Sequence, residues 1–171
     1  MKVVNQLNDS LSEFRVIIDD RSEVSPGFKF NEWEQKGVPL RVEVGPKDIE
    51  KNSFLVSRRD DESKNSYPMD DVQNTIKKLL DEIQDNLYKN SENTLKENTT
   101  HVESFSELIE VLNSKKGFVS CFWKENKEDE LKIKEETTAT LRCYPLENTD
   151  SEKAVNSDSE NGNFAIFSKA Y

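Results

Sequence analysis

Residues 25–48 read SPGFKFNEWEQKGVPLRVEVGPKD, and this stretch carries a helix signal followed at once by a strand signal. The chain breaks at Pro26, after which aromatic residues recur at spacings that suit a short helix ending near Lys36. Gly37 is a typical residue just past a helix end. The aromatic residues are Phe28, Phe30 and Trp33.

The segment 38–45 alternates apolar and polar residues with a period of two. That period predicts a half-buried strand with Arg41 and Glu43 on the same face. Outward from it, we expect a strand at 14–20, a helical turn at 46–51 and a strand at 53–59. Together these elements predict an α/β layer.

The chain beyond the polar stretch 60–68 predicts a second α/β unit. Apolar residues at helical spacing predict a long amphipathic helix from Met69 to about Asn93. A capping-box pattern at Ser104 and Glu107 begins another helix, to 114. We then expect a strand at 118–123, a charged helix at 125–137, a strand at 139–146, a polar loop at 147–161 and a strand at 163–171.

Length and composition indicate a globular chain of two small domains. There are 171 residues, of which 33% are hydrophobic and 34% are charged. No apolar run approaches the roughly 20 residues that a membrane span needs, and the start has no signal-peptide pattern. We therefore expect a cytoplasmic protein without a membrane partner, in which Cys121 and Cys143 are reduced, buried structural thiols.

The formal charge of −10 argues against nonspecific binding of DNA or RNA, which depends on phosphate neutralisation by Lys and Arg. The charge is uneven, however. Between Pro26 and Arg59 there are seven basic and five acidic residues, so this stretch carries +2 and the remainder −12. Any contact with RNA is therefore expected to be local.

Four side chains of this stretch have the chemistry to read a base. Bases of single-stranded loops are recognised by stacking on aromatic rings and by hydrogen bonds to their edges. Phe30 offers the ring. Glu34 suits the donors on the Watson–Crick edge of guanine, while Arg41 and Lys47 suit its O6 and N7 acceptors. In the alternative interpretation the three aromatic residues are core, and Glu34 and Arg41 form an ordinary surface ion pair worth at most about 1 kcal/mol.

The stretch also resembles the anticodon-binding domain of prolyl-tRNA synthetases of the archaeal and eukaryotic type. The similar segments are PGFKFNEWE, KGVPLRVEVGPKD and SRRD, followed further on by KKGFV and the terminal SKAY. The resemblance implies a mixed-sheet anticodon-binding domain at 1–68, truncated at its N-terminus. It implies a small α/β C-terminal domain of the same family at 69–171, including a long connecting helix. On this basis the chain is expected to be a C-terminal part of a longer enzyme.

The resemblance also implies a function, which is to recognise proline tRNA through the two guanines of its anticodon. The implied contacts are Phe30, Glu34, Arg41, Lys47 and Lys64. In this family the enzyme is a class II ligase that joins proline to its tRNA with ATP and magnesium and is dimeric through its catalytic core. By the same resemblance, Tyr171 is expected to dock onto the catalytic domain.

Two expectations concern what is missing. Family members commonly hold a structural zinc with four cysteines in the C-terminal domain, but the corresponding positions here are Lys124, Asp129, Ser157 and Ser159. Since tetrahedral zinc needs close Cys or His ligands, we expect the zinc site to be lost. No catalytic residues are expected in this chain, because it has no phosphate loop and no pairing of a nucleophile with a base. The rival hypothesis is a noncatalytic interaction module, or a tRNA-binding accessory, derived from this family.

Overall fold

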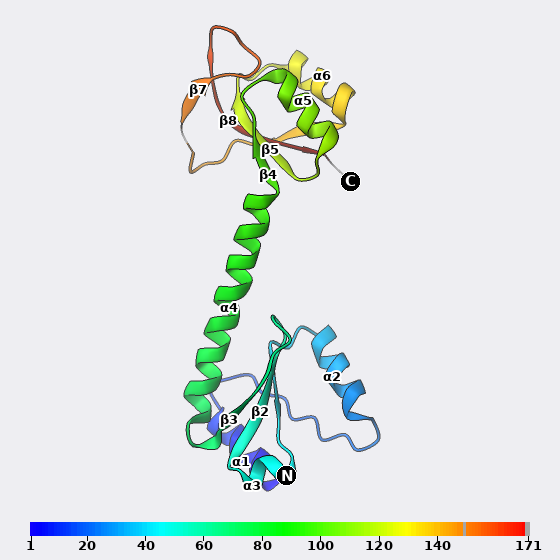
Figure 1. Cartoon of the computed structure of the whole chain (residues 1–171), viewed down its shortest axis with the longest axis vertical. Coiled ribbons are helices and arrows are strands. Elements are labelled where there is room, and N and C mark those ends of the chain that lie inside the picture. Colours follow the sequence, from blue (N-terminus) through cyan, green and yellow to red (C-terminus); the bar gives the residue numbers. More distant parts are fainter. Residues whose placement is uncertain (149, 170–171) are drawn as a thin grey trace. The chain divides into compact units, whose positions relative to one another are not determined.

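The computed structural model describes residues 1–148 and 150–169, and it divides into two compact units, Met1–Asn90 and Ser91 onward (Figure 1). Both units combine helices with one sheet, as the α/β prediction requires. The domain boundary expected after residue 68 stays a prediction.

The first unit is built on a three-stranded antiparallel sheet in the order β1-β2-β3. Its register places Arg41 of β1 opposite Ser57 of β2. The elements of this unit are α1 (Lys2–Ser10), α2 (Pro26–Gln35), β1 (Leu40–Glu43), α3 (Pro46–Glu50), β2 (Ser53–Arg58), β3 (Lys64–Pro68), a 3-10 turn η1 (Met69–Asp71) and the beginning of α4 (Val72–Glu97).

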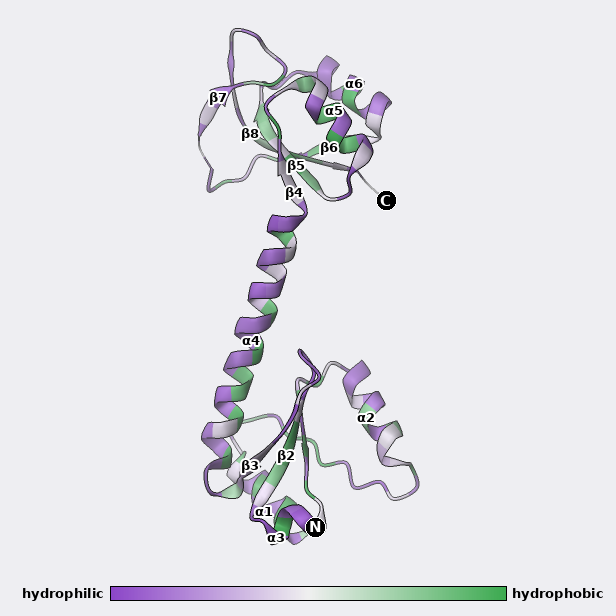
Figure 2. Ribbon diagram, in the orientation of Figure 1, coloured by the Kyte–Doolittle hydropathy of each residue, from purple (hydrophilic) through white to green (hydrophobic). Residues whose placement is uncertain are grey.

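The core of the first unit lies between the sheet, α1 and the first half of α4. Phe54 and Val56 of β2 are almost wholly buried there. Along α4, apolar residues spaced by four, three and four form one buried stripe, and beyond it Leu87 and Leu95 are exposed. Figure 2 accordingly shows a mostly hydrophilic helix with scattered hydrophobic positions. The buried residues of the core of the first unit are Leu7, Leu11, Phe54, Val56, Val72, Ile76 and Leu79.

A buried ion pair fixes α4 to the end of β2. Asp60, whose side chain is 1% exposed, accepts hydrogen bonds from Arg58 Nη2 at 2.8 Å and from Asn86 Nδ2 at 2.8 Å. Arg58 Nη1 also donates to Glu82 Oε2 of α4 at 2.9 Å. The hydrogen bond from Arg58 lowers the pKa of Asp60 to about 2.

The second unit contains a mixed five-stranded sheet with helices on one face. Its strand order is β4-β5-β8-β6. Strand β7 pairs with the beginning of β8, at residues 161–163, whereas β6 pairs with its end, at residues 166–169. Only the β4–β5 pair is parallel among the described strands. The elements are β4 (Thr99–His101), α5 (Phe105–Ser114), β5 (Phe118–Trp123), α6 (Lys127–Thr137), β6 (Ala139–Cys143), β7 (Ser151–Lys153) and β8 (Asn161–Lys169).

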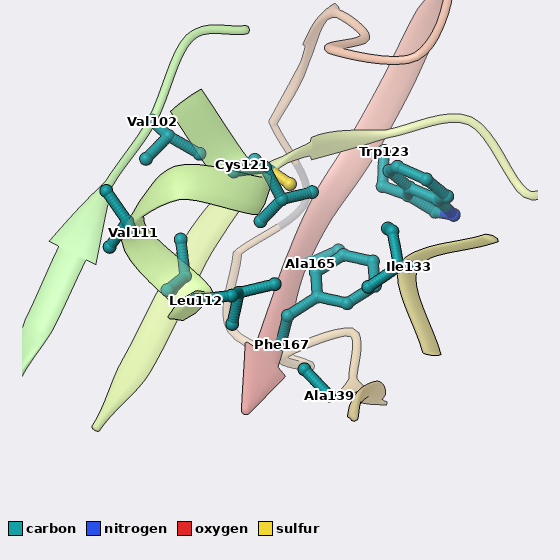
Figure 3. Close-up of a cluster of buried hydrophobic side chains, with 11 residues drawn as sticks. Val102, Val111, Leu112, Cys121, Trp123, Ile133, Ala139, Ala165 and Phe167 are labelled. Atoms are coloured by element: carbon teal, nitrogen blue, oxygen red, sulfur yellow. The ribbon is translucent and has the colours of Figure 1, made fainter. Parts of the chain in front are cut away.

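The core of the second unit is centred on Trp123, which packs edge-on against Phe167 with 5.0 Å between ring centroids (Figure 3). Helices α5 and α6 cover this face of the sheet with Leu108, Leu112 and Ile133. Gly162 of β8 allows two backbones to approach closely, since a Cβ there would lie 2.3 Å from the carbonyl carbon of Trp123.

Most predicted elements are confirmed, but the predicted strand at 14–20 is wrong. This segment has no sheet partner among the described residues, and Ile17 is 66% exposed. A run of β-branched residues is compatible with a strand, but a strand also needs a neighbour to satisfy its backbone groups.

Four elements were not predicted: α1, β3, β4 and β7. The three strands are short, polar and at sheet edges. They therefore lack the alternation of apolar and polar residues by which a strand is recognised in a sequence.

Candidate nucleic-acid interface

Helix α2 presents Phe30 and Glu34 one turn apart. The Ser25 hydroxyl accepts a hydrogen bond from the backbone N–H of Phe28, and Pro26 occupies the first turn, where its missing N–H is harmless. Gly37, with φ +82°, follows the helix end. These local signals set the ends of the helix and thereby the face on which the two residues lie.

Strand β1 supplies Arg41 from its non-core face, since the neighbouring Leu40 and Val42 pack toward the core. Arg41 Nη1 donates to Glu34 Oε1 at 2.5 Å, and Arg41 Nε donates to Glu43 Oε1 at 2.9 Å. The Arg41 side chain is 14% exposed and that of Glu34 is 51% exposed. The guanidinium is thus oriented by a carboxylate on each side.

Two cations lie over the Phe30 ring. The guanidinium carbon of Arg41 is 4.0 Å from the ring centroid, and Lys64 Nζ of β3 is 5.8 Å from it. Arg41 and Lys64 therefore lie at the partly exposed Phe30 ring, and Glu34 joins this group through its hydrogen bond with Arg41.

Lys47 does not join this group. It is exposed on α3, and within the described ranges it makes no contact with the other four side chains. The predicted role of Lys47, which is to donate to guanine or to an adjacent phosphate, therefore stays a prediction.

The alternative interpretation is wrong for the aromatic residues, because none is fully buried and Phe28 is 57% exposed. Its ion pair does form, between Glu34 and Arg41. Two of the charged groups expected to read guanine therefore bind each other.

Three further residues support this site and were not predicted to do so. Glu43 orients Arg41, and its place two residues along the same strand was the available signal. Arg59 Nε donates to the backbone carbonyl of Glu34 at 3.2 Å. Asp19 accepts from Trp33 Nε1 at 2.8 Å across 14 residues, and no sequence pattern indicates that contact.

In the second unit, hydrogen bonds of Asn156 connect two of the positions where the resemblance implies zinc ligands, Lys124 and Asp129. Asn156 Nδ2 donates to the backbone carbonyl of Lys124 at 2.9 Å and to Asp129 Oδ2 at 3.0 Å. Asn156 Oδ1 accepts from the Lys124 backbone N–H at 3.0 Å. Over residues 1–148 and 150–169, no group of three or more His, Cys, Asp or Glu residues has the arrangement of a metal site. Lys124, Asp129, Ser157 and Ser159 include no Cys or His, so the loss of the zinc site stays a prediction.

The two cysteines differ in environment. Cys121 is buried as predicted, and desolvation raises the pKa of its thiol to about 12. Cys143 is exposed, so the prediction of a buried thiol is wrong there. It lies next to a bulge in the pairing of β6 with β8.

Two remaining expectations concern docking and membranes. Tyr171, the expected docking residue, lies outside the described residues. Of the helices in the described part of the chain, none combines the length and the apolar character needed to cross a bilayer.

Comparison with protein families assigns both parts of the chain. Residues 1–79 match the model described as anticodon binding domain, and residues 105–171 match the one described as prolyl-tRNA synthetase, C-terminal.

Whole-chain comparisons agree. The chain is 44% identical to a proline–tRNA ligase of Alkaliphilus oremlandii over 84% of this chain and 30% of the relative. It is 44% identical to one of a Roseiflexus species over 92% of this chain and 33% of the relative. It therefore spans about a third of the length of these relatives.

A solved structure shows the same fold. It is the prolyl-tRNA synthetase of Cryptosporidium parvum complexed with L-proline and AMP, which superposes with a TM-score of 0.88 at 36% identity. The match covers 99% of this chain and 37% of that one. The chain belongs to the prolyl-tRNA synthetase family, in which it corresponds to the anticodon-binding domain and the C-terminal domain.

Proposed function

We propose that this chain is the tRNA-recognition part of a proline–tRNA ligase, and that its first unit reads the two guanines of the proline anticodon. Phe30 stacks on a base, and Glu34 accepts from a Watson–Crick edge. Arg41 and Lys47 donate to O6 and N7 or to adjacent phosphates, and Lys64 contacts the same loop. The observation that carries the proposal is that Arg41 and Lys64 lie over the Phe30 ring while Arg41 also pairs with Glu34, in a chain of this family.

The resident ion pair suggests how guanine is selected. Guanine offers donors to Glu34 and acceptors to Arg41, so each group exchanges its present partner for an equivalent one on the base. A base with a different edge leaves one of the two charges without a partner, and an unpaired charge or polar group in a contact is costly.

The remaining assignments concern the longer protein, and the family membership supports them. We propose that a catalytic domain elsewhere in that protein uses ATP and magnesium, that the full-length enzyme is a homodimer, and that Tyr171 docks onto the catalytic domain. Since its partner is a tRNA, we place the enzyme in the cytoplasm.

We also propose that the C-terminal domain holds no structural zinc. The side chains at Lys124, Asp129, Ser157 and Ser159 support this, since none is a cysteine or histidine. The hydrogen bonds of Asn156 join Lys124 to Asp129 instead.

Binding of the 171-residue chain to RNA stem-loops tests the function. The loops carry the proline anticodon or one in which both guanines are replaced. We expect tighter binding to the first, and a loss of about 1 to 3 kcal/mol for Arg41→Ala. Lys51→Ala is the control, because it removes a positive charge from an exposed residue on the same stretch.

The outcome separates the proposal from its rival. An interaction module without base reading binds both loops equally, and that result would overturn the proposal. Equal losses for Arg41→Ala and Lys51→Ala would show that charge alone holds the RNA, and this would remove Arg41 from the reading site.

A further inference from the structure

Helix α2, which carries Phe30 and Glu34, has little apolar support. None of its described side chains is fully buried, and none belongs to the core of the first unit. A ten-residue helix is marginal in water without tertiary contacts. Polar contacts must therefore set its position.

Asp19 is the centre of those contacts. Its carboxylate accepts from Trp33 Nε1 at 2.8 Å and from Arg21 Nε and Nη2 at 2.9 and 2.6 Å. Lys29 Nζ lies 3.6 Å from Asp19 Oδ1 and donates to the backbone carbonyl of Asp19 at 3.3 Å. The Asp19 side chain is 13% exposed, so these donors occupy most of its surface. The hydrogen bonds from Arg21 lower the pKa of Asp19 below its usual value.

Arg21 extends the network along the helix. Its Nη2 donates to Glu32 Oε2 at 2.8 Å, and Lys36 Nζ donates to the other oxygen of Glu32 at 2.5 Å. Lys36 Nζ also lies 4.4 Å from the centroid of the Trp33 ring. Contacts at Lys29, Glu32, Trp33 and Lys36 follow one helical stripe over two turns.

Phe30 and Glu34 occupy the adjacent stripe, which contacts Arg41 of β1. The helix is thus held along one side by the 19–21 segment and meets the sheet along the other. A change in the first set of contacts rotates or shifts the second, because both belong to one rigid helix.

We infer that Asp19 is a positioning residue for the base-reading site: it fixes helix α2 so that Phe30 and Glu34 meet Arg41 in the geometry that guanine requires. This inference rests on the proposed function. In this inference Asp19 acts through helix α2 and does not contact the base. An asparagine there keeps one acceptor oxygen but cannot serve Trp33, Arg21 and Lys29 together.

Asp19→Asn tests the inference, with Asp20→Asn as a matched control. Asp20 is the exposed neighbour and undergoes the same change of charge, and no contact of its side chain is found within the described ranges. We expect Asp19→Asn to weaken binding of the proline anticodon loop about tenfold and to reduce the preference for the two guanines, since a site with loosened supporting contacts loses its geometry. Asp20→Asn is expected to bind as the unchanged chain does.

Hydrogen exchange gives a readout that needs no RNA. In Asp19→Asn, the amides of α2 are expected to exchange faster while those of α4 in the first unit are unchanged, because α2 contributes nothing to the core. A double-mutant cycle with Trp33→Phe, which removes the Nε1 donor and keeps an aromatic ring, is expected to show that the two losses are not additive.

Each contrary outcome has a separate meaning. If the unchanged chain does not prefer the proline anticodon, the proposed function fails, while faster exchange in α2 would still support the anchoring role of Asp19. Equal affinity and equal exchange for Asp19→Asn and Asp20→Asn would overturn the inference. A general loss of stability with an equal loss of affinity for both loops would also overturn it, since Asp19 would then support folding alone.

Discussion

The guanidinium carbon of Arg41 lies 4.0 Å from the centroid of the Phe30 ring, while the same guanidinium bonds Glu34 and Glu43. The guanidinium thus lies over a face of the ring and is held there by two carboxylates. One consequence is that Arg41 occupies this face of Phe30 and offers its own plane to a base, because guanidinium planes stack on bases as aromatic rings do.

The variant Arg41→Lys separates the effect of the planar guanidinium from the effect of the positive charge. Lysine keeps the positive charge but cannot bond two carboxylates in a plane or stack as arginine does. We expect a loss of about 1 to 3 kcal/mol in binding of the proline anticodon loop. The slope of affinity against salt concentration is expected to stay the same, because the number of cations is unchanged. An unaltered affinity would contradict the planar role.

Asp60 gives a pH dependence to the stability of the first unit. The pKa of Asp60 is about 2 in the folded chain, against a usual value of 3.8. A lowered folded-state pKa stabilises the fold above the unfolded-state value, so this contribution is complete above about pH 4 and is lost as the pH falls toward 2.

The variant Asp60→Asn removes this contribution. At neutral pH we expect it to lower the free energy of unfolding by about 2 to 3 kcal/mol, because Arg58 loses its buried partner. In urea titrations, the difference in unfolding free energy between Asp60→Asn and the unchanged chain is expected to become smaller between pH 4 and pH 2. Asp85→Asn, at an exposed position of α4, is the control. A difference in unfolding free energy that does not change with pH would show that Asp60 does not contribute this pH dependence.

Gly162 tests the close approach of β8 to β5. In Gly162→Ala the new methyl group lies 2.3 Å from the carbonyl carbon of Trp123 and 2.5 Å from its oxygen. Because both are backbone atoms, the strands must shift, at a cost of about 1 to 3 kcal/mol in unfolding free energy. Gly27→Ala is the matched control, since nothing lies within 4 Å of its Cβ position. Equal stability of the two variants in urea would show that the sheet accommodates the methyl group.

Asn156 and a chelator test the zinc-free arrangement of the second unit. A strong chelator is expected to leave the melting temperature of that unit unchanged. Asn156→Ala is expected to lower it by about 5 °C, because three hydrogen bonds between Lys124, Asp129 and Asn156 are lost. Ser159→Ala, at one of the four positions where the resemblance implies zinc ligands, is the control because Ser159 is exposed. A chelator that lowers the melting temperature would show a bound structural metal.

The helix and the strand that carry the residues proposed to read bases could be found in the sequence because their signals are local. Pro26 and Gly37 mark the helix ends, and the alternation around Arg41 defines a strand. Each of these signals depends on a few neighbouring residues, and the same short-range geometry forms in the fold.

The sequence by itself therefore determined the family and both α/β units, and it singled out Phe30, Glu34, Arg41, Lys47 and Lys64 as candidate contacts. The tertiary structure decided three things that the sequence did not show: that 14–20 finds no sheet partner among the described residues, that Arg41 and Lys64 lie over the Phe30 ring, and that Asp19 contacts Trp33. The physical reason is the separation along the sequence of the residues that interact. Helix ends and strand faces follow from neighbouring residues, whereas strand pairing and long-range hydrogen bonds depend on which distant segments the fold brings together.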